Sequence, residues 1–408
     1  DTIKGFSGLS DYYFTSDKLE AYGNGNMLKG GLVYADRITT VSRSYSSEIR
    51  MPFYGEGLDG LLRARSKQLS GIVNGIDYNV YNPKTDKDIA VNYSVEDVIK
   101  AKAANKTALQ KELGLEENPD AFMLGIVSRL TDQKGLDLVE CVLDQICAED
   151  VQLVVLGTGE GKYQDMFTYY SRKYPERVSA NIFYSEALSH RIYASCDAFL
   201  MPSLFEPCGL SQLMSLRYGT LPIVRETGGL RDTVTPYNEV DGTGTGFSFT
   251  NYNAHEMLAI IRYAKKTYFN DRKAWNEMVL RAMKQDFSWD ASAREYEKLY
   301  DGLIEEEARR KEAIRLQQAR EAAEAALKEA EKALELAKRA EEKAIRKFNG
   351  IEDEQEDEKI KTAEAPEEDL EAEGSEPEEV SETPEAAPEP DEALEVSETS
   401  ETSVKAKE

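Results

Sequence analysis

The alternation of short apolar runs with helical patterns constrains the fold of this chain most strongly. Runs typical of buried strands lie at 122–127, 151–156, 178–184, 198–201 and 221–224, with helical patterns at 135–146, at 189–195 and after Gly209. Strands that alternate with helices predict a parallel sheet covered on both faces, and such sheets bind ligands beyond the carboxyl ends of their strands. We therefore expect an α/β domain whose chemistry lies in the loops after the strands.

The rest of the chain divides around this domain, which we place at 119–302. Residues 1–82 mix apolar runs with turn signals, as expected for the C-terminal remnant of a preceding α/β domain, and 83–118 form a polar linker containing a helix at 95–113. Residues 303–349 contain no Gly or Pro and predict one long charged helix. Residues 350–408 predict a disordered acidic tail, because they cannot bury enough apolar surface to offset chain entropy.

The long helix carries a heptad seam that starts at Leu316 and continues almost entirely in alanine as far as Ala344. Alanine buries little area, so a coiled coil through this seam predicts only weak self-association. A single solvated helix is the open alternative.

The net charge of −26 is concentrated in the tail. Residues 351–408 carry 24 acidic and 4 basic side chains, a net charge of −20, which leaves −6 for residues 1–350. Because the body has no stripe of Lys and Arg, we expect no nucleic-acid partner. No apolar run is long enough to span a bilayer, so we expect no membrane partner.

The cysteines and histidines limit which sites the chain can form. Cys141, Cys147, Cys196 and Cys208 form no CxxC pair, which indicates free thiols in a reducing compartment. With two histidines and no Cys/His cluster, a structural metal is not expected. Asp86-Lys87-Asp88 has the Asp-x-Asp spacing of a divalent-cation site, but we interpret it as a solvated linker.

Two cations follow the first strand of the domain, in the loop SRLTDQKG. Arg129 and Lys134 can together hold a diphosphate and neutralise charge on a phosphate leaving group. The alternative is that both are ordinary surface charges.

Two glycine-rich loops follow other strands of the sheet. LGTGEGKY contains Gly157 and Gly159, which permit close backbone approach by an anion before a helix N-terminus, and RETGGLRDTV contains Gly228 and Gly229. Each loop is either a tight turn or a phosphate contact.

Glu206 follows the strand at 198–201, in PSLFEPCGLSQL, just before a helix that begins near Gly209. Its carboxylate can accept hydrogen bonds from sugar hydroxyls, while free N–H groups of the helix face the same ligand. The alternative role is that of a helix-capping carboxylate.

In order along the chain, these loops resemble the glycogen and starch synthases, which are retaining glucosyltransferases of the two-domain GT-B architecture. The resemblance covers about 28–300 and rests on LKGGLVYADRITTVSRSYSSEI, NGIDYNVYNP, SRLTDQKG, LGTGE, YSEALSHRIYASCDAFLMPSLFEPCGL, YGTLPIVRETGGLRDTV and FSWDASAREYEKLY. It implies two Rossmann-like domains, of which the first is incomplete here.

The resemblance also implies roles for individual residues. It places Arg129 and Lys134 on the donor diphosphate, Glu206 on the donor glucose, Cys208 and Gly209 in the sugar pocket, Tyr184 on the adenine, Thr227, Gly228 and Gly229 on the phosphates, and Asn74 near the sugar. His190 is interpreted as a structural residue of its helix.

Two departures from the family pattern matter. Met214 stands where many related GT-B enzymes have a second glutamate, which favours the synthase branch. Lys29-Gly30-Gly31 matches the lysine-glycine-glycine donor loop of the family by letters only, since it lies inside the later LKGGLVYAD segment. The chain begins with Asp1 and not Met, so we expect an N-terminally truncated fragment that is inactive alone.

The implied activity of the intact protein is transfer of glucose from ADP-glucose to the non-reducing end of an α-1,4-glucan, with retention. Neither a cofactor nor a metal is implied, because the cations supply the positive charge. We expect a bacterial cytoplasmic location, or a plastid if a transit peptide preceded this chain. The alternatives are another GT-B glycosyltransferase or a non-catalytic glucan-binding scaffold.

Overall fold

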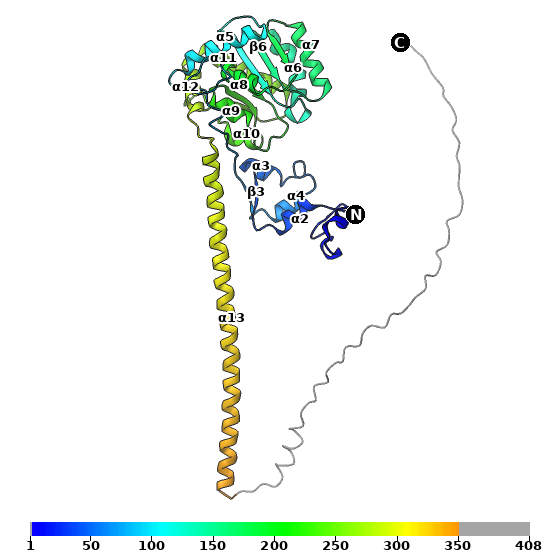
Figure 1. Ribbon diagram of the computed structural model, residues 1–408, viewed down its shortest axis with the longest axis vertical. Coiled ribbons are helices and arrows are strands. Elements are labelled where there is room, and N and C mark those ends of the chain that lie inside the picture. The colour runs from blue at the N-terminus through cyan, green and yellow to red at the C-terminus, as the bar shows by residue number, and fades with distance from the viewer. Residues whose placement is uncertain (1, 351–408) are drawn as a thin grey trace, which may run out of the picture. The chain divides into compact units, whose positions relative to one another are not determined.

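The computed structural model describes residues 2–350 and divides the chain into two compact units, 1–314 and 315–408 (Figure 1). The predicted disordered tail lies almost wholly outside the described residues. The first unit contains a six-stranded sheet and a smaller segment that precedes it. Within 2–350, no helix is both long and apolar enough to cross a membrane.

The sheet is entirely parallel, as the alternation predicted. Its strands lie in the order β10-β9-β8-β5-β6-β7. Their bounds are Phe122–Val127 for β5, Val151–Leu156 for β6, Val178–Asn181 for β7, Ala198–Met201 for β8, Leu221–Arg225 for β9 and Phe247–Phe249 for β10. Three predicted strands are confirmed at both ends, β7 is shorter than predicted, and β10 was not predicted.

Helices cover both faces of this sheet (Figure 1). Helix α6 packs against α11 on one face, and α8 packs against α5 and α9 on the other. Their bounds are Val98–Leu113 for α5, Leu136–Ala148 for α6, Gly161–Lys173 for α7, Glu186–Ser195 for α8, Ser211–Arg217 for α9, Gly228–Thr233 for α10, Ala254–Asn270 for α11 and Arg272–Met283 for α12. Strand β7 ends early because Ser185 caps α8, which leaves 182–185 as a loop.

The segment before residue 82 has short elements around a parallel pair of strands, β3 (Ile38–Thr40) and β4 (Leu69–Gly71). The remaining elements are α1 (Thr2–Ser7), η1 (Asp11–Tyr13), β1 (Glu20–Ala21), β2 (Asn24–Gly25), α2 (Met27–Tyr34), α3 (Arg43–Glu48) and α4 (Asp59–Ala64). A parallel strand pair joined by a crossover that contains α3 and α4 fits the predicted remnant of an α/β domain. The predicted boundaries at 82 and 118 stay predictions.

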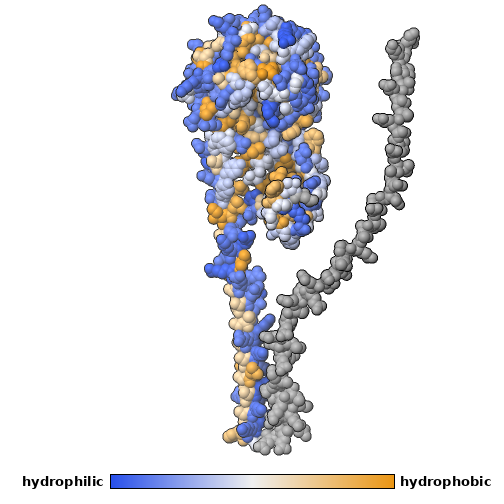
Figure 2. Space-filling model, turned by 45° about the vertical axis from the view of Figure 1, so that its right-hand side comes forward, coloured by the Kyte–Doolittle hydropathy of each residue, from blue (hydrophilic) through white to orange (hydrophobic). Residues whose placement is uncertain are grey.

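The last described element is a single helix, α13 (Trp289–Phe348). It begins before residue 303 because the preceding segment anchors its first turn. Ser288 bridges to Ile76, and the Ser292 hydroxyl donates to the carbonyl of Val73 at 2.7 Å. Within the second unit, Leu316, Leu327 and Leu334 are exposed. Hydrophilic and hydrophobic residues alternate along this helix, as the mixed colours of Figure 2 show. Self-association through this helix stays a prediction.

A buried ion pair joins the linker helix α5 to the sheet. The Lys106 ammonium lies 2.7 Å from an Asp197 carboxylate oxygen and also donates to the carbonyl of Ala121 and the hydroxyl of Tyr268. Both charged side chains are more than nine-tenths buried. Charges in this position are tolerated only when every donor and acceptor is matched.

We expect Lys106→Ala to lower the free energy of unfolding by about 3–5 kcal/mol, because it leaves the Asp197 carboxylate buried without its partner. Urea unfolding followed by circular dichroism measures this change. Lys111→Ala removes an exposed lysine of the same helix and should change stability by less than about 0.5 kcal/mol. Equal stability of the two variants would contradict the assignment.

Candidate functional site

The site lies where the strand order of the sheet reverses. From β5 the chain proceeds to β6 and β7 on one side, and then returns to β8, β9 and β10 on the other. The connections that follow β5 and β8 therefore run toward opposite edges of the sheet, and open α/β sheets bind ligands in a crevice at such a reversal. We call this position, at the loops after β5 and β8, the crevice. Lys134 follows β5 and Glu206 follows β8.

Lys134 and Glu206 form an ion pair across this crevice. The Lys134 ammonium lies 2.6 Å from a Glu206 carboxylate oxygen, which also accepts a hydrogen bond of 3.1 Å from the Ser203 hydroxyl. The side chains are only 16% and 8% exposed. Helix α9 begins at Ser211 without a side-chain cap, so the alternative role of Glu206 as a cap of this helix is wrong.

The loop after β5 is docked tightly on the loop after β8. Gln133 accepts the Leu204 N–H through its carbonyl at 2.9 Å, and a Cβ at Gly135 would lie 2.0 Å from the Pro202 carbonyl oxygen. Gly135 has a φ of +69° and only glycine fits there. This docking, and not the ion pair alone, fixes the distance between Lys134 and Glu206.

Arg129 lies in the same loop but is exposed, and it donates to the Gln133 side chain at 3.3 Å. The structure thus brings Lys134 to Glu206 and leaves Arg129 at the mouth of the crevice, with a guanidinium that can turn toward a ligand. The contact of Arg129 and Lys134 with a diphosphate stays a prediction.

Arg225, at the end of β9, supports Glu206 and was missed by sequence reasoning. Its guanidinium donates to the backbone carbonyls of Leu204 at 2.9 Å and Ser203 at 3.3 Å. It therefore holds the backbone just before Glu206. The signal was present in the sequence, since an Arg directly after a buried strand in RETGGLRDTV points to the same edge of the sheet.

Gly157 and Gly159 pack against the loop after β5. A Cβ at Gly157 would lie 1.9 Å from the Ser128 carbonyl oxygen, and one at Gly159 would lie 2.2 Å from that of Leu130. The Gly157 N–H donates to the Asn181 carbonyl at 3.1 Å. Close packing accounts for both glycines, and their contact with a donor stays a prediction.

Cys208 and Gly209 line the turn between Glu206 and α9, and Asn74 reaches this turn from the first segment. Burial raises the pKa of the Cys208 thiol to about 11, although a hydrogen bond from the Asn74 backbone lowers it. Cys208 is therefore a neutral thiol near pH 7 and not a nucleophile. Gly209 has a φ of +72°, which allows the turn to close over Gln212.

Thr227, Gly228 and Gly229 lie directly behind Glu206. The Gly229 N–H donates to the Glu206 carbonyl at 3.0 Å. The Gly228 N–H and the Thr227 hydroxyl both bind the carboxylate of Glu48, at 2.8 Å and 3.2 Å. Sequence reasoning missed Glu48, because it comes from α3, far away along the chain.

Tyr184 follows β7 in the loop 182–185 and is 85% exposed. Its ring is therefore free to stack on a planar group. Its contact with an adenine stays a prediction.

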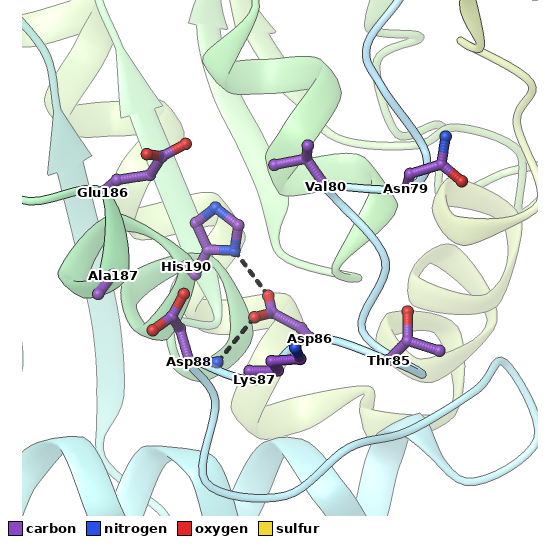
Figure 3. Close-up of a pocket in the computed structure, with 9 residues that line it drawn as sticks. All are labelled: Asn79, Val80, Thr85, Asp86, Lys87, Asp88, Glu186, Ala187 and His190. Carbon is purple, nitrogen blue, oxygen red and sulfur yellow. Dashed lines mark hydrogen bonds and ion pairs between the residues drawn. The ribbon is translucent and has the colours of Figure 1, made fainter.

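A second polar cluster lies beside a pocket of about 480 Å³ between the linker and α8. His190 Nδ1 and an Asp86 carboxylate oxygen lie 2.7 Å apart, and Asp86 also accepts hydrogen bonds from the Tyr218 hydroxyl and the Asp88 N–H. Figure 3 shows His190 and the Asp88 backbone converging on Asp86. Asp86 is 7% exposed, so its interpretation as part of a solvated linker is wrong.

Asp86, Asp88 and His190 are the one group of potential metal ligands among the described residues. Asp86 already contacts His190, Tyr218 and the Asp88 N–H, which explains the cluster as a protein network that holds the linker to α8. His190 lies buried on α8, as its structural interpretation expected. The expected absence of a metal stays a prediction.

The Asp86 network predicts a loss of stability in acid. Burial raises the pKa of Asp86, but the hydrogen bonds from His190 and Tyr218 outweigh it and hold the pKa below the ordinary value of 3.8. A lowered folded-state pKa stabilises the fold above the ordinary pKa, and this contribution is lost as the pH falls from 3.8 through the folded-state value.

We expect Asp86→Asn to be less stable than the parent chain at pH 7 and to lose less stability between pH 4 and pH 3. Urea unfolding at these pH values measures both effects. Asp88→Asn, which changes the exposed neighbour, should keep the pH dependence of the parent. Identical pH dependence in the parent and Asp86→Asn would contradict the role given to Asp86.

Two family models match this chain. One describes the starch synthase catalytic domain and matches residues 1–64. The other describes group 1 glycosyl transferases and matches residues 107–279, which include the crevice loops after β5 and β8. The matches therefore cover both parts of the first unit.

The chain is similar to glycogen synthases of known bacteria. It is 69% identical over 301 residues to the glycogen synthase of Lachnospira eligens, a match that covers 74% of this chain and 63% of that protein. It is 63% identical over 302 residues to that of Lachnoclostridium phytofermentans, again covering 74% and 63%. The chain thus spans a little less than two thirds of the length of these relatives.

Among solved structures, the chain is similar to the catalytic domain of starch synthase IV from Arabidopsis thaliana, bound to ADP and acarbose. The two are 34% identical with a TM-score of 0.68, and the match covers 72% of this chain and 62% of that one.

Proposed function

This chain belongs to the glycogen and starch synthase family, whose glycosyltransferases have the GT-B fold, and from that premise we propose that it forms the donor-binding half of an α-glucan synthase. The intact enzyme transfers glucose from ADP-glucose to the non-reducing end of an α-1,4-glucan, with retention of configuration. The observation that carries this proposal is the Lys134–Glu206 pair, which lies at the strand reversal between β5 and β8.

The electrostatics of the crevice suit an anionic donor. Lys134 and Glu206 carry opposite charges that balance each other, and the nearby Arg129 adds one further positive charge, so the three groups together are net positive toward a diphosphate. Arg129, at the mouth of the crevice, adds a guanidinium that binds two phosphate oxygens at once. Together they stabilise the charge that develops on the departing nucleoside diphosphate, so neither a metal nor a cofactor is needed.

Glu206 acts as a binding and charge-stabilising group in this proposal. Its carboxylate accepts hydrogen bonds from Lys134 and Ser203 through one oxygen, which leaves the other oxygen for a sugar hydroxyl. Met214 stands one turn into α9, where a second carboxylate is absent. Glu206 therefore lacks the activating partner that a nucleophile needs.

The choice of ADP-glucose rests on the family and on the ADP of starch synthase IV, carried over to this chain as a proposal. Exposed Tyr184 supplies a surface for the adenine. Closure of the first domain over the crevice excludes water and limits hydrolysis of the donor. Because the chain spans 63% of its relatives, we propose that it binds the donor but does not elongate glucan alone.

We expect ADP to bind this chain in isothermal titration calorimetry, and we expect this binding to weaken in Lys134→Ala.

Turnover is measured in a chimera, in which residues 2–302 replace the matched region of the Lachnospira eligens glycogen synthase. The assay measures incorporation of labelled glucose into glycogen. In this chimera, Lys134→Ala and Glu206→Gln should each lower kcat by about 10²–10³. Lys111→Ala, an exposed lysine on α5, should leave kcat unchanged.

The alternatives give different results in the same assays. Full activity of Lys134→Ala would contradict the mechanism, and elongation with UDP-glucose but not ADP-glucose would contradict the donor. A chimera that transfers sugar only to another acceptor indicates a different GT-B glycosyltransferase. Glucan binding by the chain without ADP binding indicates a scaffold, and glucan elongation by the chain alone would contradict its proposed incompleteness.

A further inference from the structure

Two carboxylates join helix α3 of the first segment to helix α10 behind the site. Glu48, the last residue of α3, accepts the Gly228 N–H at 2.8 Å and the Thr227 hydroxyl at 3.2 Å. Asp232, in the last turn of α10, accepts the Ser44 N–H at 3.0 Å and the Ser44 hydroxyl at 2.6 Å. The two helices therefore run antiparallel. The C-terminal end of α3 binds the N-terminal end of α10, and the C-terminal end of α10 binds the N-terminal end of α3.

This arrangement satisfies groups that neither helix satisfies alone. The first N–H groups of a helix have no partner within it, and a carboxylate is placed unfavourably at the C-terminal end of its own helix. Glu48 and Asp232 each lie near the C-terminal end of their own helix, and their carboxylates bind polar groups at the N-terminal end of the neighbouring helix. We call these four residues, Ser44, Glu48, Gly228 and Asp232, together with Thr227, the carboxylate clamp.

The two halves of the clamp differ in burial. Thr227 is fully buried and its hydroxyl has no other hydrogen-bond partner among the described residues, so Glu48 is needed to satisfy it. The Ser44–Asp232 contacts are exposed, and water can replace them. The Glu48 half therefore carries most of the effect.

The clamp lies in direct contact with the backbone of Glu206. Gly228 has a φ of +44°, and a Cβ there would lie 2.0 Å from the Glu206 carbonyl oxygen. Gly229 donates to that same oxygen at 3.0 Å, and a Cβ on it would lie 2.0 Å from the Cys208 carbonyl oxygen. With no space between the two segments, a displacement of α10 displaces Glu206.

We propose that Glu48 is a positioning residue, which holds α10 so that Glu206 stays at the correct distance from Lys134. The inference rests on the proposed function and extends it to a residue of the first segment. It also assigns Thr227 and Gly228 to the support of Glu206, because Glu48 uses their hydrogen-bond donors inside the protein. The geometry of the donor site then depends on the attachment of the first segment through Glu48.

Glu48→Ala in the chimera tests this inference. We expect kcat to fall by about tenfold to a hundredfold, because small misplacements of a reacting group have effects of this size. KM for ADP-glucose, and the affinity of the chain for ADP, should change by less than about threefold, since Lys134 and Arg129 remain. Glu48→Gln keeps an acceptor oxygen for Gly228 and should recover part of kcat.

Glu140→Ala is the matched control, since it removes an exposed glutamate from α6 and should leave kcat unchanged. If Glu48→Ala is unfolded at the assay temperature, Thr227→Val tests the inference instead, because this change removes only the hydroxyl that binds Glu48. An unchanged kcat in the folded variant, or an equal loss of ADP affinity and kcat, overturns the inference. An inactive parent chimera overturns the proposed function as well, whereas an active chimera indifferent to Glu48→Ala overturns this inference alone.

Discussion

The reversal of strand order between β5 and β8 determines where this protein can do chemistry. At that point the connections after β5 and β8 run toward opposite edges of the sheet, and the loops that begin these connections lie against each other. Lys134 and Glu206 meet there at 2.6 Å. Two largely buried opposite charges lower the stability of the fold unless their geometry is fixed. The surrounding loops therefore hold both side chains in one arrangement. Gly135 against Pro202, and Arg225 against Leu204, are the means by which this geometry is fixed.

The strands and their loops were predictable because the information is local. The aliphatic runs at 122–127, 151–156 and 198–201 end at turn residues, and their loops follow from the direction of a parallel sheet. The partners of the site residues were not predictable in this way. Glu48 meets Gly228 across 180 residues, and Asp86 meets His190 across 104, so no local pattern marks either carboxylate as buried or bonded. Polar residues in a polar stretch predict a solvated linker, because the hydrogen-bond donors that bury them come from distant parts of the chain.

For helix α13, the sequence prediction placed the start of the helix at a change in composition, and this placement was wrong. The predicted start at residue 303 marks the change to an Ala, Glu and Lys-rich sequence, but the backbone is helical from Trp289. The first turns belong to the first unit, because Ser292 and the residue before Trp289 contact the segment 73–76. Composition changes where packing ends, whereas a helix ends where its backbone hydrogen bonds end. The same helix therefore serves as part of a packed body at one end and as an exposed element at the other.

A continuous series of short contacts runs from the first segment to the Lys134–Glu206 pair. Glu48 binds Gly228, Gly228 and Gly229 abut the carbonyl of Glu206, and the side chain of Glu206 binds Lys134. Each contact involves backbone or a charge-assisted hydrogen bond, so none can lengthen without losing its partner. In the proposed function, the donor binds at the loops after β5 and β8, and the acceptor approaches from the side of the first domain. Under the proposed function, a carboxylate of the first segment that fixes Glu206 makes the geometry of the donor site depend on that segment, even where the segment does not touch the donor.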